Sequence, residues 1–110
     1  MKVAYIFMTS MSHYILKNMI IPQIEKGIHG AEVVGMFFVG DNTFMLEKGQ
    51  NIGDKIEKLQ QKNGMMVLGC DQCVEDRMLQ KKLIGCTIIG CFPHFYADLA
   101  GNPPDQVITI

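Results

Sequence analysis

The sequence predicts an α/β fold in which helices cover both faces of a mostly parallel five-stranded sheet. Five short apolar runs lack the alternation of polar and apolar residues, which is typical of strands buried on both faces. Segments with helical spacing or helix-start signals separate these runs, so strands and helices alternate along the chain. The length of 110 residues, with 48% hydrophobic residues, fits a single core. We therefore expect one domain over residues 1–110.

The five predicted strands contain apolar, β-branched or aromatic residues and are bounded by turn-forming residues or glycine. They cover residues 3–8, 33–39, 65–69, 87–90 and 107–110. The first strand ends at Thr9 and Ser10, and the second ends at the turn Gly40-Asp41-Asn42. Since the runs are apolar rather than alternating, they are expected to form a mostly parallel sheet that helices cover on both faces.

Two helices are predicted in the first half of the chain. Ser12 is placed to cap the first, Gly27 and Gly30 stop it, and Pro22 is expected to bend or fray it. A helical turn is expected over residues 43–48. The second helix combines apolar residues at helical spacing with charges that suit the helix dipole and a glycine stop signal. These are Ile52, Ile56 and Leu59, then Asp54, Lys58 and Lys62, then Asn63-Gly64.

In the second half, one helix is expected from Val74 to about Lys82 and a shorter one from Pro93 to about Leu99. Because crossovers between parallel strands are right-handed, this order favours a flavodoxin-like doubly wound arrangement. In such sheets, ligands bind where the carboxyl ends of the strands meet loops and helix N-termini. That edge should gather four segments, which hold three of the four cysteines: residues 9–13, 40–42, 70–73 and 91–94.

The thiols Cys70 and Cys73 lie at the junction of the third strand and the helix that follows. A helix N-terminus lowers the pKa of a thiol, and the thiolate is the nucleophile. Cys73 is the better candidate for the nucleophile, because it is nearer the helix N-terminus. Arg77 lies one helical turn further on, where its positive charge could support a thiolate. The negative charge of Asp71, which lies beside both thiols, disfavours the thiolate form. The alternative is that both cysteines are small buried core residues.

A zinc site is the second interpretation of these cysteines, because Cys70 and Cys73 have the spacing of metal ligands. Cys86 and Cys91 bracket the fourth strand, which separates them by roughly 16 Å, too far for one metal ion. A site from Cys70, Cys73 and Cys91 with His94 stays open. Cys86 is expected to be packed, and Cys91 is a thiol of the rim without an assigned role.

His13 is a second rim histidine and could act as a general base, although a surface histidine beside a helix start is the more common case. The chain has no glycine-rich phosphate-binding pattern, so no nucleotide cofactor is expected. A net charge of −1 gives no indication of the clustered Lys and Arg residues that binding to nucleic acid or to an anionic membrane needs. No export signal or membrane-length apolar run is visible, which favours a cytoplasmic protein with reduced cysteines.

Several segments in this order resemble the DsrE/DsrF-like family, and the resemblance runs over nearly the whole chain. The most specific piece is a strand, a Cys-x-x-Cys motif and a helix with Arg four residues after the second Cys, here residues 64–77. The remaining pieces are Met8-Thr9-Ser10, Gly40-Asp41-Asn42, Glu47-Lys48-Gly49 and residues 105–110.

This resemblance implies a sulfur-relay protein with sulfurtransferase-like activity, which carries persulfide sulfur on a cysteine between donor and acceptor proteins. It also implies a homo-oligomer, a trimer or a hexamer, and it requires no cofactor or metal. The family's sulfur-bearing cysteine matches Cys73, and Cys70 is present in only some branches. The chain departs from the family pattern at Asp71-Gln72, where small residues are common, and at Met78, where Gly is frequent.

Two other functions stay open. The first is a non-catalytic module that binds a small ligand or a metal, or serves assembly, through the rim of the sheet. The second is dithiol redox activity of the thioredoxin kind, which is disfavoured because no Trp or Pro stands next to the cysteines.

Overall fold

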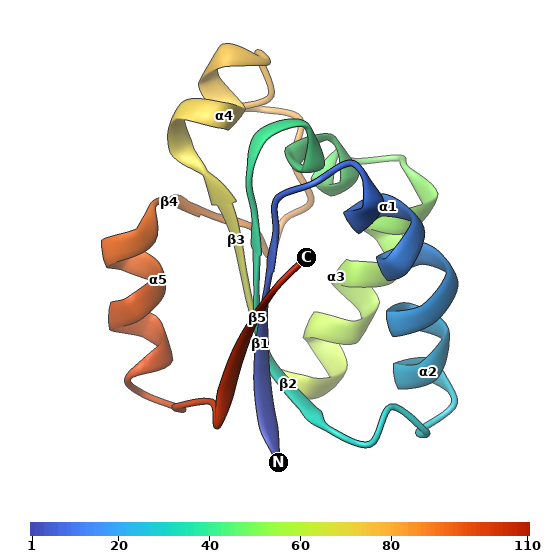
Figure 1. Ribbon diagram of the computed structural model, residues 1–110. Helices are drawn as coiled ribbons and strands as arrows, with labels where there is room; N and C mark the ends of the chain where they lie inside the picture. The colour runs from blue at the N-terminus through green and yellow to red at the C-terminus, as the bar shows by residue number, and fades with distance from the viewer.

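The computed structural model describes all 110 residues and has a five-stranded sheet at its centre (Figure 1). The strand order is β4-β3-β2-β1-β5, and every neighbouring pair is parallel. The α/β class predicted from the apolar runs is confirmed, and each strand starts and ends within one residue of its expected position. The strands are β1 Lys2–Phe7, β2 Glu32–Phe38, β3 Met66–Cys70, β4 Ile88–Gly90 and β5 Gln106–Thr109.

Helices cover both faces of this sheet, as a doubly wound fold requires. Figure 1 shows α1, α2 and α3 on one face and α5 on the other. The reason lies in the strand order: β1, β2 and β3 follow one another in one direction, whereas the chain crosses back from β4 to β5. A right-handed crossover that runs backwards puts its helix on the opposite face. The helices are α1 Met11–Ile15, α2 Ile21–Glu25, α3 Asn51–Asn63, α4 Asp71–Asp76 and α5 Phe92–Leu99.

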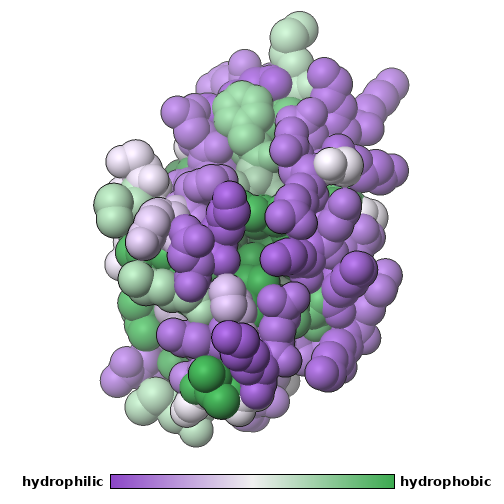
Figure 2. All heavy atoms as spheres, turned by 90° about the vertical axis from the view of Figure 1, so that its right-hand side faces the viewer, coloured by the Kyte–Doolittle hydropathy of each residue, from purple (hydrophilic) through white to green (hydrophobic).

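Alternate side chains of the strands pack into two separate apolar clusters. Val3, Tyr5 and Phe7 of β1 point into the larger cluster, which has 20 buried residues, below α1 to α3. Ala4 and Ile6 point into the smaller cluster of eight, below α5. The outer surface over α1 to α3 is mainly hydrophilic, with hydrophobic atoms visible between the polar side chains (Figure 2). None of the helices is both long enough and apolar enough to span a membrane.

The first helical region runs on from α1 through a π-helical segment, Leu16–Ile20, into α2. Pro22 stands in the first turn of α2, directly after the π-helical turn. The wide turn accommodates a residue that has no N–H to donate, so the helix continues instead of fraying. Ser12 is not the cap that was expected: it is buried inside α1, and its Oγ donates to the carbonyl of Ile110 at 2.8 Å.

The helix predicted around Ile52, Ile56 and Leu59 is confirmed as α3, and these three side chains are buried. It ends at Gly64, whose φ of 72° lies in the left-handed region that glycine adopts without strain. The helical turn expected over residues 43–48 starts earlier, as the 3₁₀ segment Gly40–Leu46.

The helix expected from Val74 to Lys82 is wrong in length, because α4 covers only Asp71–Asp76. Met78 has a φ of 57° and turns the chain out of the helix, which allows Leu79 to be buried beside Val74. In a regular helix, residues five positions apart, such as Val74 and Leu79, would not lie on the same face. Glycine adopts such a left-handed backbone without strain, whereas a residue with a side chain, such as Met78, rarely does.

Candidate functional site

Cys70 and Cys73 lie at the carboxyl edge of the sheet, where β3 passes directly into α4. Cys70 is both the last residue of β3 and the cap of α4, because its Sγ accepts a hydrogen bond from the Cys73 backbone N–H at 3.4 Å. A thiol sulfur therefore occupies the position that Ser or Asp usually holds at a helix start. This capping contact sets the orientation of Cys70 towards the first turn of the helix.

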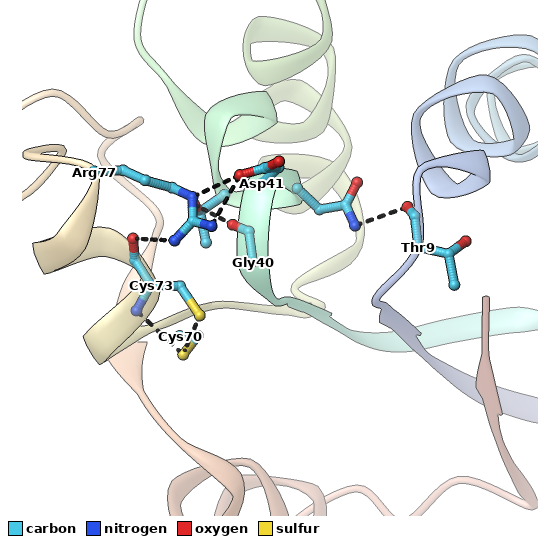
Figure 3. Close-up of polar contacts among 8 residues, drawn as sticks. Thr9, Gly40, Asp41, Cys70, Cys73 and Arg77 are labelled. Atoms are coloured by element: carbon cyan, nitrogen blue, oxygen red, sulfur yellow. Dashed lines mark hydrogen bonds and ion pairs between the residues drawn. The ribbon is translucent and has the colours of Figure 1, made fainter.

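The two sulfur atoms face each other at 2.7 Å, and both residues are free thiols (Figure 3). Their access to solvent differs. Cys70 is only 8% exposed and packs in the apolar cluster below α5, whereas Cys73 is half-buried at the edge of that cluster. Cys73 is thus the thiol that an external sulfur compound can reach, and Cys70 is the thiol behind it.

Burial is the largest cause that raises the pKa of Cys70, which reaches about 11. The hydrogen bond between the side chains of Cys70 and Cys73 raises it further, and nearby charge on Cys73 or Cys91 acts in the same direction. The backbone N–H of Cys73 lowers the pKa, but its contribution is smaller. Cys70 is therefore a protonated thiol near neutral pH.

This raised pKa predicts a distinct pH profile for alkylation of Cys70. At pH 8 only about one part in 1,000 of a group with a pKa near 11 is ionised. We expect the iodoacetamide reaction rate at Cys70 to rise about tenfold per pH unit from pH 7 to pH 10, because the thiolate is the reactive form. Peptide mass spectrometry separates Cys70 from Cys73. In urea-unfolded chain the Cys70 profile should level off near pH 9, and levelling at that pH in the folded chain would contradict the assignment.

Arg77 does not fold back onto the sulfur of Cys73, as its sequence position had suggested. Its Nη1 donates to the carbonyl oxygen of Cys73 at 3.1 Å, and its Nε and Nη2 lie 2.9 and 2.8 Å from Oδ1 of Asp41 (Figure 3). The guanidinium group needs several oxygen acceptors to satisfy its donors, and a sulfur would satisfy fewer of them. Arg77 therefore fixes α4 against the loop after β2 and acts on Cys73 only through the backbone.

Cys91 and His94 lie at the start of α5, and His94 packs over Gly90. Gly90 pairs with Cys70 between β4 and β3, so Cys91 follows one residue later at the same edge. His94 instead lies 3.2 Å from the carboxylate of Asp98, one helix turn away. No set of three His, Cys, Asp or Glu side chains in the chain is arranged to hold a metal ion, so the zinc site considered for Cys70, Cys73, Cys91 and His94 is not formed.

Cys86 is half-buried, packs against the larger apolar cluster and precedes β4, away from the carboxyl edge. The expectation that it is a packing residue agrees with this position. The burial of Cys86 is also the largest cause that raises its pKa.

His13 lies apart from the thiols, in a cavity of about 460 Å³ on the α1 to α3 side of the rim. The cavity has a mixed polar lining that includes Lys17, Asn42 and Glu47. Asn42 is buried, and its Nδ2 donates to the carbonyl of Thr9 at 3.0 Å, which joins the loops after β1 and β2. Asp41 borders this cavity and also holds Arg77, so one guanidinium group separates the cavity from the backbone of Cys73.

The sequence pattern had selected the turn at residues 40–42 but had not assigned a role to Asp41. The sequence signal for this role was the negative charge of Asp41, opposite to that of Arg77, in a loop at the same edge of the sheet. The expectation that both loops lie at the carboxyl edge grouped them, but only the strand order shows that they are adjacent.

The chain matches no described protein family, and it matches no curated protein. Among solved structures, it is similar to the crystal structure of the YchN protein from E. coli, with a TM-score of 0.70 over 99% of this chain and 97% of that chain. The sequences are 19% identical, so the similarity concerns the fold. It shows that the two chains share the α/β fold.

Proposed function

We propose that this chain is a persulfide carrier in a sulfur relay, with Cys73 as the residue that holds the sulfur. The observation that carries the proposal is the arrangement of the two thiols: one reachable sulfur in the first turn of a helix, with a second, buried sulfur 2.7 Å behind it. The DsrE-like fold and the resemblance of residues 64–77 to the sulfur-carrying motif support the same function.

Loading and delivery are two exchanges of the same kind. The Cys73 thiolate attacks the outer sulfur of a donor persulfide, the S–S bond of the donor breaks, and the donor leaves as a thiolate. Cys73 then carries the sulfur as Cys73–S–SH until an acceptor thiolate attacks its outer sulfur and restores the Cys73 thiolate. Neither exchange needs a cofactor or an external oxidant, because the sulfur changes partners without net electron transfer to a third group.

The proposed partners are donor and acceptor proteins of the relay and further copies of this chain, as a trimer or a hexamer. Support for self-association comes from the sheet edges, where apolar residues are exposed: Ile88 and Ile89 on β4 are 37% and 43% exposed, and Val107 on β5 is 48% exposed. Edge strands with exposed apolar side chains are usually covered by another element or subunit.

The carrier function is tested by incubating the reduced chain with a persulfide donor and measuring its intact mass. We expect the addition of one sulfur atom per chain, which peptide mapping after alkylation places on Cys73. The added sulfur should be lost when a small thiol acceptor is supplied. A chain that gains no sulfur, or that gains it mainly on Cys86, would contradict the proposal.

A non-catalytic binding module is the second candidate, and the cavity beside His13 and Lys17 is the observation that favours it. Its acidic, basic and amide groups suit a small polar ligand rather than an apolar one. Native mass spectrometry of the purified chain distinguishes the two functions: a stoichiometric small-molecule adduct that is lost in Lys17→Ala would favour a binding module. The metal-binding form of this candidate has no support from the arrangement of the side chains.

A further inference from the structure

Cys70 is placed to react with whatever Cys73 carries, but not to carry sulfur itself. Its sulfur lies 2.7 Å from that of Cys73, and the two residues are three positions apart across one helix turn (Figure 3). Sulfur atoms this close can form a disulfide bond, whose S–S length is about 2.0 Å, with little movement of the chain. The Cys70 side chain is packed against the small cluster below α5 and is 8% exposed, so an additional sulfur atom on it would have to displace apolar neighbours.

We propose that Cys70 discharges a persulfide held on Cys73, releasing hydrosulfide and leaving a Cys70–Cys73 disulfide. This inference rests on the proposed function, because it begins from the loaded carrier. It adds an activity, sulfide release, and a means of control, since the oxidised carrier holds no free Cys73 thiol and cannot accept sulfur again until it is reduced.

The step is balanced within the loaded chain. Cys70 Sγ attacks the inner sulfur of the persulfide, which is Cys73 Sγ, and a bond forms between the two cysteine sulfurs. The bond from Cys73 Sγ to the outer sulfur breaks, and the outer sulfur leaves as hydrosulfide with the proton that Cys70 gives up. The outer sulfur is reduced by two electrons, and the two cysteines are oxidised to the disulfide. A thiol reductant of the dithiol class then resets the pair by ordinary exchange.

The inner sulfur is the favoured point of attack for two reasons. Attack on the outer sulfur would move the persulfide onto Cys70, where the packing leaves no space for it. Attack on the inner sulfur expels hydrosulfide, which is a weaker base than a cysteine thiolate and leaves more readily. The same packing also slows the discharge, because burial raises the pKa of Cys70 to about 11 and keeps it protonated at neutral pH. Sulfur therefore stays available for an acceptor and is released when none arrives.

The experiment loads the full chain with a persulfide donor, removes the donor by gel filtration, and follows free sulfide and intact mass without oxygen. We expect wild-type chain to release one sulfide for each internal disulfide formed, at a rate independent of protein concentration. In Cys70→Ser and Cys70→Ala, each normalised to its own loading, sulfide release should be at least about tenfold slower, because the intramolecular nucleophile is gone. Cys86→Ser is the matched control and should discharge like wild type.

The outcomes distinguish failure of the discharge from failure of the carrier function. If the chain loads on Cys73 but loses sulfur equally fast with and without Cys70, or without forming the disulfide, then the discharge is wrong and the carrier function stands. If the chain does not load at all, both fall. The disulfide measured in wild-type chain does not depend on any variant, so a folding defect in Cys70→Ser or Cys70→Ala would not obscure the result.

Discussion

Cys73→Ser is expected to reduce persulfide loading of the chain by roughly 100-fold or more, because a serine hydroxyl is not ionised near neutral pH and is a poor nucleophile towards sulfur. Cys70 should not replace it, since it is buried and has a pKa raised to about 11. The substitution replaces one sulfur atom with oxygen at a half-buried position, so the fold should be retained. Intact mass after donor treatment measures the loading, and circular dichroism checks the fold.

The matched controls are Cys86→Ser and Cys91→Ser, which place the same substitution before and after β4. Cys86 lies away from the carboxyl edge, and its loss should leave loading unchanged. Cys91 is at the edge, next to the residue that pairs with Cys70, and tests whether a neighbouring thiol takes sulfur. Strong loading that persists in Cys73→Ser and disappears in Cys91→Ser would move the carrier role to Cys91.

Phe37→Ala should strongly destabilise the fold, lowering the free energy of unfolding by about 3–5 kcal/mol. Phe37 is fully buried in β2, and its ring centroid lies 5.1 Å from those of both Phe92 and Phe95 in α5. Removing the ring leaves a cavity between the sheet and α5 that these rings cannot fill without moving. Because this cluster also encloses Cys70, we expect faster alkylation of Cys70 in the variant. Urea unfolding measures the stability.

Phe44→Ala is the control for this prediction, because Phe44 is 45% exposed and lies in the 3₁₀ segment after β2. At this position the same substitution should lower the free energy of unfolding by well below half as much, since part of the ring is already in contact with water. Equal destabilisation by the two substitutions would show that the cluster below α5 contributes less than its packing indicates.

The sequence was most informative where structure depends on neighbouring residues. The apolar runs identified all five strands to within one residue at their starts. For β1, β2 and β3 the reason is burial on both faces, which needs apolar side chains at nearly every position, whereas β4 and β5 form the edges of the sheet and are partly exposed. Helical spacing with a terminal glycine identified α3 for a similar local reason. The same kind of signal failed for α4, because the left-handed turn at Met78 is stabilised by burying Leu79 in a core that the local pattern does not describe.

For the candidate site, the chain pattern placed Cys70 and Cys73 at a strand-to-helix junction, since both elements adjoin the motif in sequence. It left open which thiol is reachable, because that depends on α5 and β2 packing over Cys70 from distant parts of the chain. It also assigned Arg77 to the thiolate, whereas the strand order brings Asp41 within 2.8 Å of its guanidinium. Short-range patterns therefore determined which residues form the site, and long-range packing decided their exposure and partners.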